Sequence, residues 1–321
     1  MPTYKRASLI DAQLAWFAAA VQGREDRVEL LVSDNCSPDG TAAVCERWSA
    51  ALRGRLRTRF HRQASNVGAI RNIAWCMNEA AGEYVWVVGD DDAIHPSALH
   101  FVFETIVKQP DLALLILNYS SRHWKSGELR FERCFEVDAD LVASDGQALV
   151  ERFLRDDRPS HWGGLVLTTA LVYRTADAQA ALHAWPKGLD NISVQLFVTA
   201  HAALQGTTML TSRPHLEMAA GRHFFAEDPL VLFRFRIADI PDAFVELVRI
   251  GYSRELCLHR IRHQRRELRW RRLLKLFARH PVASASVLAR HASATLALTR
   301  PGFMSRRLAV DLSSGARDAM N

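Results

Sequence analysis

The sequence has little of what marks several protein classes. Its 321 residues contain only 16 glycines and 11 prolines, too few for a fibrous or low-complexity chain. No apolar run approaches the roughly 18 residues that a membrane-spanning helix needs. The apolar stretch 14–21 has the length of a signal-peptide core, but Asp11 and Gln13 interrupt its approach, so we expect a helix there. These absences exclude a disordered chain and a membrane-spanning protein, and leave an ordinary globular one.

Cysteines are few and scattered. The five are odd in number and never spaced as CxxC, so neither a disulfide framework nor a zinc site is indicated. A reducing compartment, the cytosol, is therefore the expected location. The cysteines are Cys36, Cys45, Cys76, Cys134 and Cys257.

Charge is unevenly distributed along the chain. The net charge is +6, but residues 241–321 hold 16 Lys and Arg against 6 Asp and Glu, which leaves 25 against 29 in the first 240 residues. Ten basic and two acidic residues lie between positions 253 and 279, among apolar residues at partly helical spacing. This pattern indicates an anionic partner, either a membrane surface or nucleic acid. A solvated helix face explains the same charges without a partner.

Short apolar strands alternate with amphipathic helices in the first 120 residues. This alternation predicts an α/β sheet with helices on both faces, in which ligands bind beyond the carboxyl ends of the strands. Further helices are expected at residues 144–154 and 192–205, and a helical, basic region from residue 242 onward. The predicted early elements are helices at 8–22, 41–52, 69–81 and 96–108, and strands at 28–33, 56–61, 83–89 and 112–119.

Three short segments carry candidate chemistry: residues 2–6 (PTYKR), 33–41 (SDNCSPDGT) and 89–92 (GDDD). The second is by itself a good turn and helix cap. Three adjacent carboxylates repel one another, and their place after an apolar strand costs stability unless a cation or several donors neutralise them. A hard divalent ion, Mg²⁺ or Mn²⁺, prefers such oxygen ligands. The alternative is an exposed acidic turn.

A fourth segment, residues 66–72 (NVGAIRN), completes an ordered set with PTYKR, SDNCSPDGT and GDDDAIHPSAL. In order and spacing the set resembles the nucleotide-sugar-binding half of the inverting family 2 glycosyltransferases of GT-A fold. The resemblance covers residues 1–120, and its SDN and GDDD variants are similar to bacterial transferases that build O-antigen, capsule and related surface glycans.

This resemblance implies a fold and a division of the chain. The fold is a GT-A, Rossmann-like, mixed and mostly parallel sheet with helices on both faces, plus a helical basic C-terminal extension. Residues 1–120 are the nucleotide-sugar-binding half, residues 121–240 the acceptor-binding half, and residues 241–321 the basic helical region.

The resemblance also implies which residues contact the nucleotide sugar. Thr3 and Tyr4 match positions that pack on the nucleotide, Asp34 matches a carboxylate that accepts from the base, and Arg71 on the next helix reaches the diphosphate. The alternatives for the NVGAIRN segment are a helix-capping asparagine and a surface arginine. The full expected set is Pro2, Thr3, Tyr4, Arg6, Asp34, Asn35, Asn66, Gly68, Arg71 and Asp90.

The register of the acidic segment is counted back from Pro96. Asp91 then falls on the metal-binding aspartate, Asp90 on a ribose-side position and Gly89 on the first aspartate of the family's DXD motif. A second register, with Asp90 and Asp92 as the pair, stays open. We expect a divalent cation, Mg²⁺ or Mn²⁺, at Asp91 and Asp92, where it would bridge the diphosphate and assist its departure.

An inverting transfer also needs a base for the acceptor hydroxyl. Relatives place an Asp or Glu about a hundred residues past the metal motif, and Asp190 lies 99 residues after Asp91, ahead of a predicted helix. An N-cap for that helix is the alternative role of Asp190. Other candidate bases are Asp156, Asp157 and Glu227.

Aromatic and histidine side chains are candidates for the acceptor pocket, because aromatic rings stack on the apolar faces of sugars. A place in the core explains each of them equally, and His223 has a distal metal ligand as a further alternative. The candidates are His161, Trp162 and His223, with Phe224 and Phe225 beside the last.

The chain departs from the family at its start. Relatives have a buried strand of about five apolar residues ahead of the PTYKR position, whereas this sequence begins Met1-Pro2. We expect that the first strand is missing and that the natural protein is longer, with an apolar β-branched segment ahead of Pro2. The alternative is that another segment completes the sheet.

These patterns together predict a glycosyltransferase that moves a sugar from a nucleotide-diphosphate donor to a saccharide or lipid-linked saccharide acceptor, with inversion. The basic C-terminal helices would hold it on anionic lipid at the inner, cytoplasmic face of the membrane. A nucleotidyltransferase would want a Gly-rich phosphate loop that PTYKR does not supply. Nucleic-acid binding is disfavoured because the acidic first 240 residues would repel a phosphate backbone. A non-catalytic relative is the remaining alternative.

Overall fold

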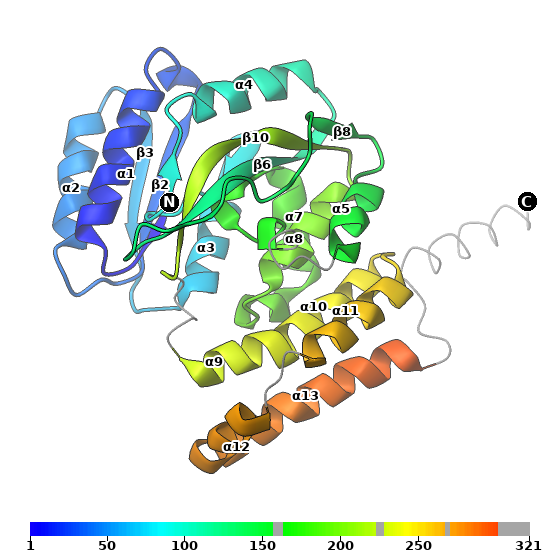
Figure 1. Cartoon of the computed structure of the whole chain (residues 1–321). Coiled ribbons are helices and arrows are strands. Elements are labelled where there is room, and N and C mark those ends of the chain that lie inside the picture. Colours follow the sequence, from blue (N-terminus) through cyan, green and yellow to red (C-terminus); the bar gives the residue numbers. More distant parts are fainter. Residues whose placement is uncertain (157–162, 223–227, 267–269, 301–321) are drawn as a thin grey trace, which may run out of the picture.

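The computed structural model describes residues 1–156, 163–222, 228–266 and 270–300. Two β-sheets lie among helices, and a further group of helices packs along one side of them (Figure 1). The predicted α/β class with a helical C-terminal region is confirmed. Parallel pairing predominates in the first sheet, whereas most pairs of the second are antiparallel.

The first sheet is parallel and has the order β1-β2-β3. Its central strand is buried along most of its length, as its apolar sequence ELLVSD requires. Every element except β1 was predicted by the apolar pattern, with ends that differ by at most three residues. These elements are β1 (Pro2–Thr3), α1 (Ala7–Ala20), β2 (Glu29–Asp34), α2 (Thr41–Leu52), β3 (Arg57–Arg62) and α3 (Ala69–Asn78).

The start of the chain belongs to this sheet. Pro2 and Thr3 form a short strand that pairs in parallel with Ser33 and Asp34. The Met1 side chain is buried, and its ammonium donates a hydrogen bond of 2.6 Å to the carbonyl of Leu31. The longer first strand ahead of Pro2 stays a prediction.

The second sheet is mixed and has the order β4-β9-β6-β10-β5, with β7 beside β6 and β8 beside β10. Among its described strands only β6 and β10 pair in parallel. Its strands are β4 (Tyr84–Trp86), β5 (Ala93–Ile94), β6 (Leu112–His123), β7 (Leu129–Phe131), β8 (Leu141–Ala143), β9 (Leu171–Arg174) and β10 (Thr207–Ala220). The helices between them are α4 (Ala98–Lys108), α5 (Gly146–Arg155), α7 (Thr175–Ala184) and α8 (Val194–Ala203).

Strand β10 is 14 residues long, and sequence analysis did not predict it. Its sequence TTMLTSRPHLEMAA contains a proline and charged residues, which read as a loop. The strand tolerates them because its register against β6 shifts on both sides of Pro214, which leaves the ladder irregular there. The segment is therefore a strand because it pairs with β6 along its length, not because of its local propensity.

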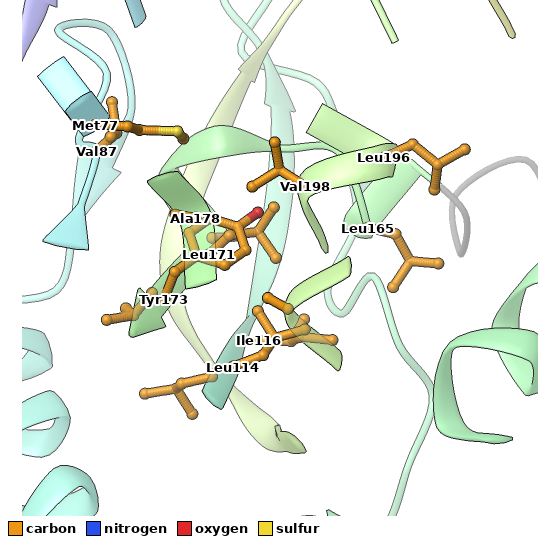
Figure 2. Close-up of a cluster of buried hydrophobic side chains, with 14 of the residues drawn as sticks. Met77, Val87, Leu114, Ile116, Leu165, Leu171, Tyr173, Ala178, Leu196 and Val198 are labelled. Atoms are coloured by element: carbon orange, nitrogen blue, oxygen red, sulfur yellow. The ribbon is translucent and has the colours of Figure 1, made fainter. Parts of the chain in front are cut away.

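The core lies where β6 and β9 pack against α7 and α8 (Figure 2). Leu114 and Ile116 of β6 and Tyr173 of β9 are fully buried there. The Tyr173 hydroxyl is satisfied by Thr199 at 2.8 Å, as burial of a phenol requires. The run of apolar residues 112–117 is buried on both faces, which explains why its sequence does not alternate.

The C-terminal helices pack on α8 and on one another. Phe244 and Leu247 of α10 join the same hydrophobic core as the second sheet, while Phe233 and Val287 form a smaller cluster. None of the described helices is long and apolar enough to cross a membrane. The division at residues 120 and 240 stays a prediction. The helices are α9 (Pro229–Arg234), α10 (Ile240–Arg249), α11 (Arg254–Arg266), α12 (Trp270–Arg279) and α13 (Pro281–Thr299), with a π-helical segment, Phe235–Asp239, between α9 and α10.

Candidate functional site

A cavity of about 720 Å³ lies where β1 and β4 end, within the range of pockets that hold small molecules. Residues of all four sequence segments line it, although those segments are up to 90 residues apart in the chain. Of the predicted site residues, those that line the cavity are Pro2, Thr3, Tyr4, Arg6, Asn35, Asn66, Gly68, Asp90, Asp91 and Asp92.

Asp90 is the most tightly held carboxylate of the acidic segment. It accepts hydrogen bonds from the Thr3 hydroxyl at 2.7 Å and from Nη1 of Arg6 at 2.6 Å. The same Arg6 nitrogen also reaches Asp91 at 2.9 Å. Burial raises the pKa of Asp90, and the Arg6 charge and the Thr3 bond oppose that shift. The first segment thus neutralises part of the acidic one.

Asp92 is also buried, and it lacks a cationic partner among the described residues. Burial and the neighbouring Asp91 charge raise the pKa of Asp92 to about 7, against the hydrogen bonds from the Thr169 side chain and the Ala219 amide, which lower it. Asp92 is therefore the group whose ionisation the fold opposes most clearly.

Thr169 is a site residue that sequence analysis missed. Its hydroxyl accepts from the Gly89 amide at 3.0 Å and donates to Asp92. A side chain at Gly89 would begin 3.0 Å from that hydroxyl, tighter than almost all real contacts. Gly89 is thus a close-packed position, and a side chain there would crowd the Thr169 hydroxyl and the Asp91 and Asp92 carboxylates.

The acidic segment suits a hard divalent ion. Asp91 and Asp92 line the cavity with carboxylate oxygens, and the raised pKa of Asp92 indicates charge that the described side chains leave uncompensated. No group of three or more His, Cys, Asp or Glu converges within the described part of the chain. An ion here would therefore take its remaining ligands from a bound molecule or water.

The second and third segments are joined by side-chain amides. Nδ2 of Asn35 donates to Oδ1 of Asn66 at 3.0 Å, and Oδ1 of Asn35 accepts from the Val67 amide at 2.9 Å. Gly68 has a φ of 85°, which favours glycine, and its amide donates to Asn66 at 2.9 Å. These bonds hold the loop before α3 against the end of β2.

Asp34 is buried behind this loop and is not among the cavity-lining residues. Oδ1 accepts from the Ser37 amide at 3.0 Å, while Oδ2 has no hydrogen-bond partner among the described residues and lies 3.7 Å from Nη1 of Arg62. An orphan buried oxygen of this kind suits a ligand donor. Contact between Asp34 and a base stays a prediction.

Two distant predicted residues, Arg71 and Asp190, are brought together. They form an ion pair of 2.7 Å, with side chains 46% and 73% exposed, and neither lines the cavity. The alternative role of Asp190 as a helix N-cap is wrong, because α8 begins at Val194 with Ser193 at its N-cap. The position of Asp190 outside the cavity lining leaves its role as a base untested.

Several predicted residues lie outside the described part of the chain: Asp157, His161, Trp162, His223, Phe224, Phe225 and Glu227. Asp156 directly follows α5, and it is absent from the lining residues. Other lining residues carried no sequence signal, since they come from parts of the chain without a motif. Those most relevant to binding are Tyr119, Ser193, Gln195, Arg222 and Phe235.

Comparisons with known proteins agree with this arrangement. The model of the glycosyl transferase family 2 matches residues 1–163. Abequosyltransferase RfbV of Salmonella typhimurium is 29% identical over 114 residues, which are 36% of this chain and 33% of that protein. The matched region thus spans a third of that relative's length.

Solved structures of TarS from S. aureus are similar across most of the chain. The structure of its residues 1–349 in complex with UDP-GlcNAc has a TM-score of 0.64 and 16% identity, over 92% of this chain and 80% of that one. A second structure of TarS residues 1–349 has a TM-score of 0.60 and 17% identity, over 92% of this chain and 79% of that one. At this identity the likeness shows the fold.

The raised pKa of Asp92 predicts a pH-dependent stability. An ordinary aspartate in the unfolded chain loses its proton near pH 4, so ionisation of Asp92 removes folding free energy as the pH rises from about 4 through 7, about 4 kcal/mol in total. We expect Asp92→Asn to stabilise the protein in the presence of chelator, by about 2 kcal/mol more at pH 8 than at pH 5. Urea unfolding at both pH values measures this difference.

The control is Asp26→Asn, a change at an exposed aspartate in the turn Glu25–Arg27. Its free energy of unfolding should equal that of the wild-type protein at both pH values. A gain for Asp92→Asn that is the same at pH 5 and pH 8 would show that Asp92 is ionised in the folded protein throughout this range.

Proposed function

Since this chain belongs to glycosyl transferase family 2, we propose that it moves a sugar from a nucleotide-diphosphate donor to a saccharide or lipid-linked saccharide acceptor, with inversion at the anomeric carbon. The observation that carries the proposal is the single cavity at which the PTYKR, SDN, NVGAIRN and GDDD segments meet. The GT-A-like α/β fold places this cavity at the ends of strands, where such folds bind ligands.

The donor occupies the side of the cavity formed by the first sheet. Pro2, Thr3 and Tyr4 border the nucleotide, and the orphan oxygen of Asp34 accepts from the base behind them. Asn35, Asn66 and Gly68 hold the loop that closes this side, a role supported by the bonds between their amides. Arg71 follows this loop on α3 and reaches the diphosphate after release from Asp190.

Asp91 and Asp92 would hold a divalent cation, Mg²⁺ or Mn²⁺. When bound, such an ion neutralises the charge that collects on the departing diphosphate. Arg6 and Thr3 have a separate task, because they fix Asp90 beside the ribose side of the donor. In this division Asp90 positions the donor, while Asp91, which also bonds Arg6, and Asp92 would hold the metal.

The transfer itself requires a proton acceptor on the opposite side of the sugar. A carboxylate takes the proton of the acceptor hydroxyl while the oxygen of that hydroxyl bonds to the anomeric carbon. The bond between the sugar and the diphosphate breaks, and its electron pair leaves with the nucleotide. We assign the proton to Asp190. Its ion pair with Arg71 places it beside the residue that we assign to the diphosphate.

The biological setting is proposed from the relatives and from charge. The similarity to an abequosyltransferase supports a role in bacterial surface-glycan synthesis, such as O-antigen. Exposed basic residues on α12, among them Lys275 and Arg279, and the exposed apolar residues Leu274 and Val282 support contact with an anionic membrane. The protein would then act in the cytoplasm at the inner face of that membrane, with no role in nucleic-acid binding.

A donor screen by thermal unfolding tests the proposed activity. One of the UDP-, GDP-, CDP- or dTDP-sugars should raise the melting temperature by several degrees at a concentration about a hundred times its Kd, with Mn²⁺ or Mg²⁺ present. Excess chelator should remove most of this shift. Asp91→Asn should lose the metal-dependent part, whereas Asp138→Asn, at an exposed aspartate, should keep it.

An equal shift with and without chelator would contradict the metal assignment. No shift with any nucleotide sugar, in a protein that unfolds cooperatively, would favour the non-catalytic relative.

The role of Asp190 is tested by changing each partner of its ion pair. Asp190→Asn should lower turnover by about 10² or more and leave donor affinity near wild type, the scale of losing a general base. Arg71→Met breaks the same ion pair, and we expect it to weaken donor binding instead. Similar small losses from both variants would indicate an exposed ion pair without a catalytic role.

Membrane contact is tested by matched charge reversal. The wild-type protein should bind vesicles with about 30% anionic lipid, because each basic residue near the surface contributes about 1 kcal/mol, and salt should release it. Lys275→Glu with Arg279→Glu should weaken binding about tenfold or more. Arg53→Glu with Arg55→Glu, at exposed positions between α2 and β3, makes the same change in net charge and should have little effect. Salt-sensitive binding to duplex DNA without vesicle binding would contradict this assignment.

A further inference from the structure

The C-terminal helices reach the cavity through the π-helical segment Phe235–Asp239. Phe235 at its start lines the cavity, and Asp239 at its end is fully buried. A π-helical turn within a helix is uncommon and costs hydrogen-bond geometry, so it usually marks a place where a side chain is redirected for function. Here the segment directs a buried carboxylate toward the wall of the cavity.

Asp239 joins three parts of the chain. Oδ1 accepts a hydrogen bond from Nη2 of Arg290 on α13 at 2.8 Å, and Oδ2 accepts one from Nε of Arg234 on α9 at 3.2 Å. Its backbone carbonyl accepts from Nδ2 of Asn191 at 2.9 Å, and Oδ2 lies 3.4 Å from the Ile192 amide. A buried carboxylate with two guanidinium partners is sensitive to the loss of either one.

Among the partners of Asp239, Arg290 is the most distant in the sequence. Its side chain is 37% exposed, and it also binds Asp242 at 2.6 Å, so a single guanidinium connects α13 to both α10 and the π-helical segment. Asp239 has no exposed surface. The geometry of Asp239, and of the backbone it holds, therefore depends on a residue of the C-terminal region.

The backbone held by Asp239 is a wall of the cavity. Ile192, Ser193, Val194 and Gln195 all line it, directly after Asn191. The Ser193 hydroxyl is buried, and it has no hydrogen-bond partner among the described residues. A buried hydroxyl without a partner, on a residue that lines a cavity, suits a polar ligand group, because an unmade hydrogen bond of a buried hydroxyl costs free energy.

We infer that Arg290 is a positioning residue: through Asp239 it fixes the Asn191–Gln195 wall so that the Ser193 hydroxyl meets a hydroxyl of the bound sugar. The inference rests on the proposed function for the identity of that ligand. It makes the C-terminal helices part of the substrate site, in addition to any contact they make with a membrane.

A second arginine offers a matched control. Arg254 of α11 also holds α13, through the backbone carbonyls of Leu298 and Arg300, the latter at 3.0 Å. These bonds lie at the far end of α13, away from Asp239. Loss of the Arg254 side chain should loosen that end of α13 and leave the wall of the cavity unchanged.

Hydrogen exchange of the full chain, followed by mass spectrometry, tests the positioning. Arg290→Met should speed exchange in residues 190–196 about tenfold or more under native conditions, because local opening follows the loss of the buried pair. Arg290→Lys should restore most of the protection, and Arg254→Met should affect residues 296–300 alone. Unchanged protection of residues 190–196 in Arg290→Met would overturn the inference.

Ser193→Ala tests the contact independently and guards against a variant that does not fold. It should leave the melting temperature near wild type and keep the affinity for the nucleoside diphosphate. If the hydroxyl meets the donor, the affinity for the nucleotide sugar from the donor screen should fall about tenfold. If it meets the acceptor, the KM for saccharide should rise by a similar factor.

The two proposals fail separately. Unchanged donor affinity and unchanged acceptor KM in Ser193→Ala would overturn the contact. Unchanged protection of residues 190–196 in a protein that binds a nucleotide sugar would overturn the positioning and leave the proposed function intact. Faster exchange in Arg290→Met, in a protein that binds no nucleotide sugar, would support the positioning and contradict the proposed function.

Discussion

Three adjacent carboxylates follow a buried strand, and their mutual repulsion governs the arrangement of the segments around them. Asp90 is compensated by Thr3 and Arg6, which come from the first residues of the chain, whereas Asp92 receives only neutral donors and has a raised pKa. The charge that remains is placed at a cavity rather than in the core. A site prepared in this way favours a cationic or metal-bound ligand, because binding such a ligand relieves the repulsion.

The two sides of the cavity are held by different means. On the side formed by the first sheet, short loops follow parallel strands and are joined by side-chain amides, so the geometry is local to β1, β2 and α3. On the other side, the wall formed by residues 191–195 depends on Asp239 and on Arg290, about a hundred residues further along the chain. A change in the C-terminal helices is therefore transmitted to the wall formed by residues 191–195 more readily than to the side formed by the first sheet.

Sequence patterns predicted the first sheet and its helices well, because each of those elements has its own apolar period and its own cap or turn. They failed for β10, whose proline and charged residues are accommodated only by irregular pairing with β6. The alternative N-cap role of Asp190 is wrong as well, because α8 begins later than the helix predicted at 192–205. Thr169 and Ser193 could not be found at all, since a single hydroxyl has no signature in a sequence.

By itself the sequence determined the α/β class, the four segments whose residues line the cavity and the concentration of negative charge at Asp90 to Asp92. Those features depend on short segments, each a strand, a turn and the residues that follow, whose structure is set by residues close in the sequence. Only the tertiary structure decided that Thr169 fills the space beside Gly89, that Arg71 pairs with Asp190, and that Arg290 pairs with the buried Asp239. Each of these pairs residues at least 50 positions apart, and such contacts depend on packing, which no local pattern encodes.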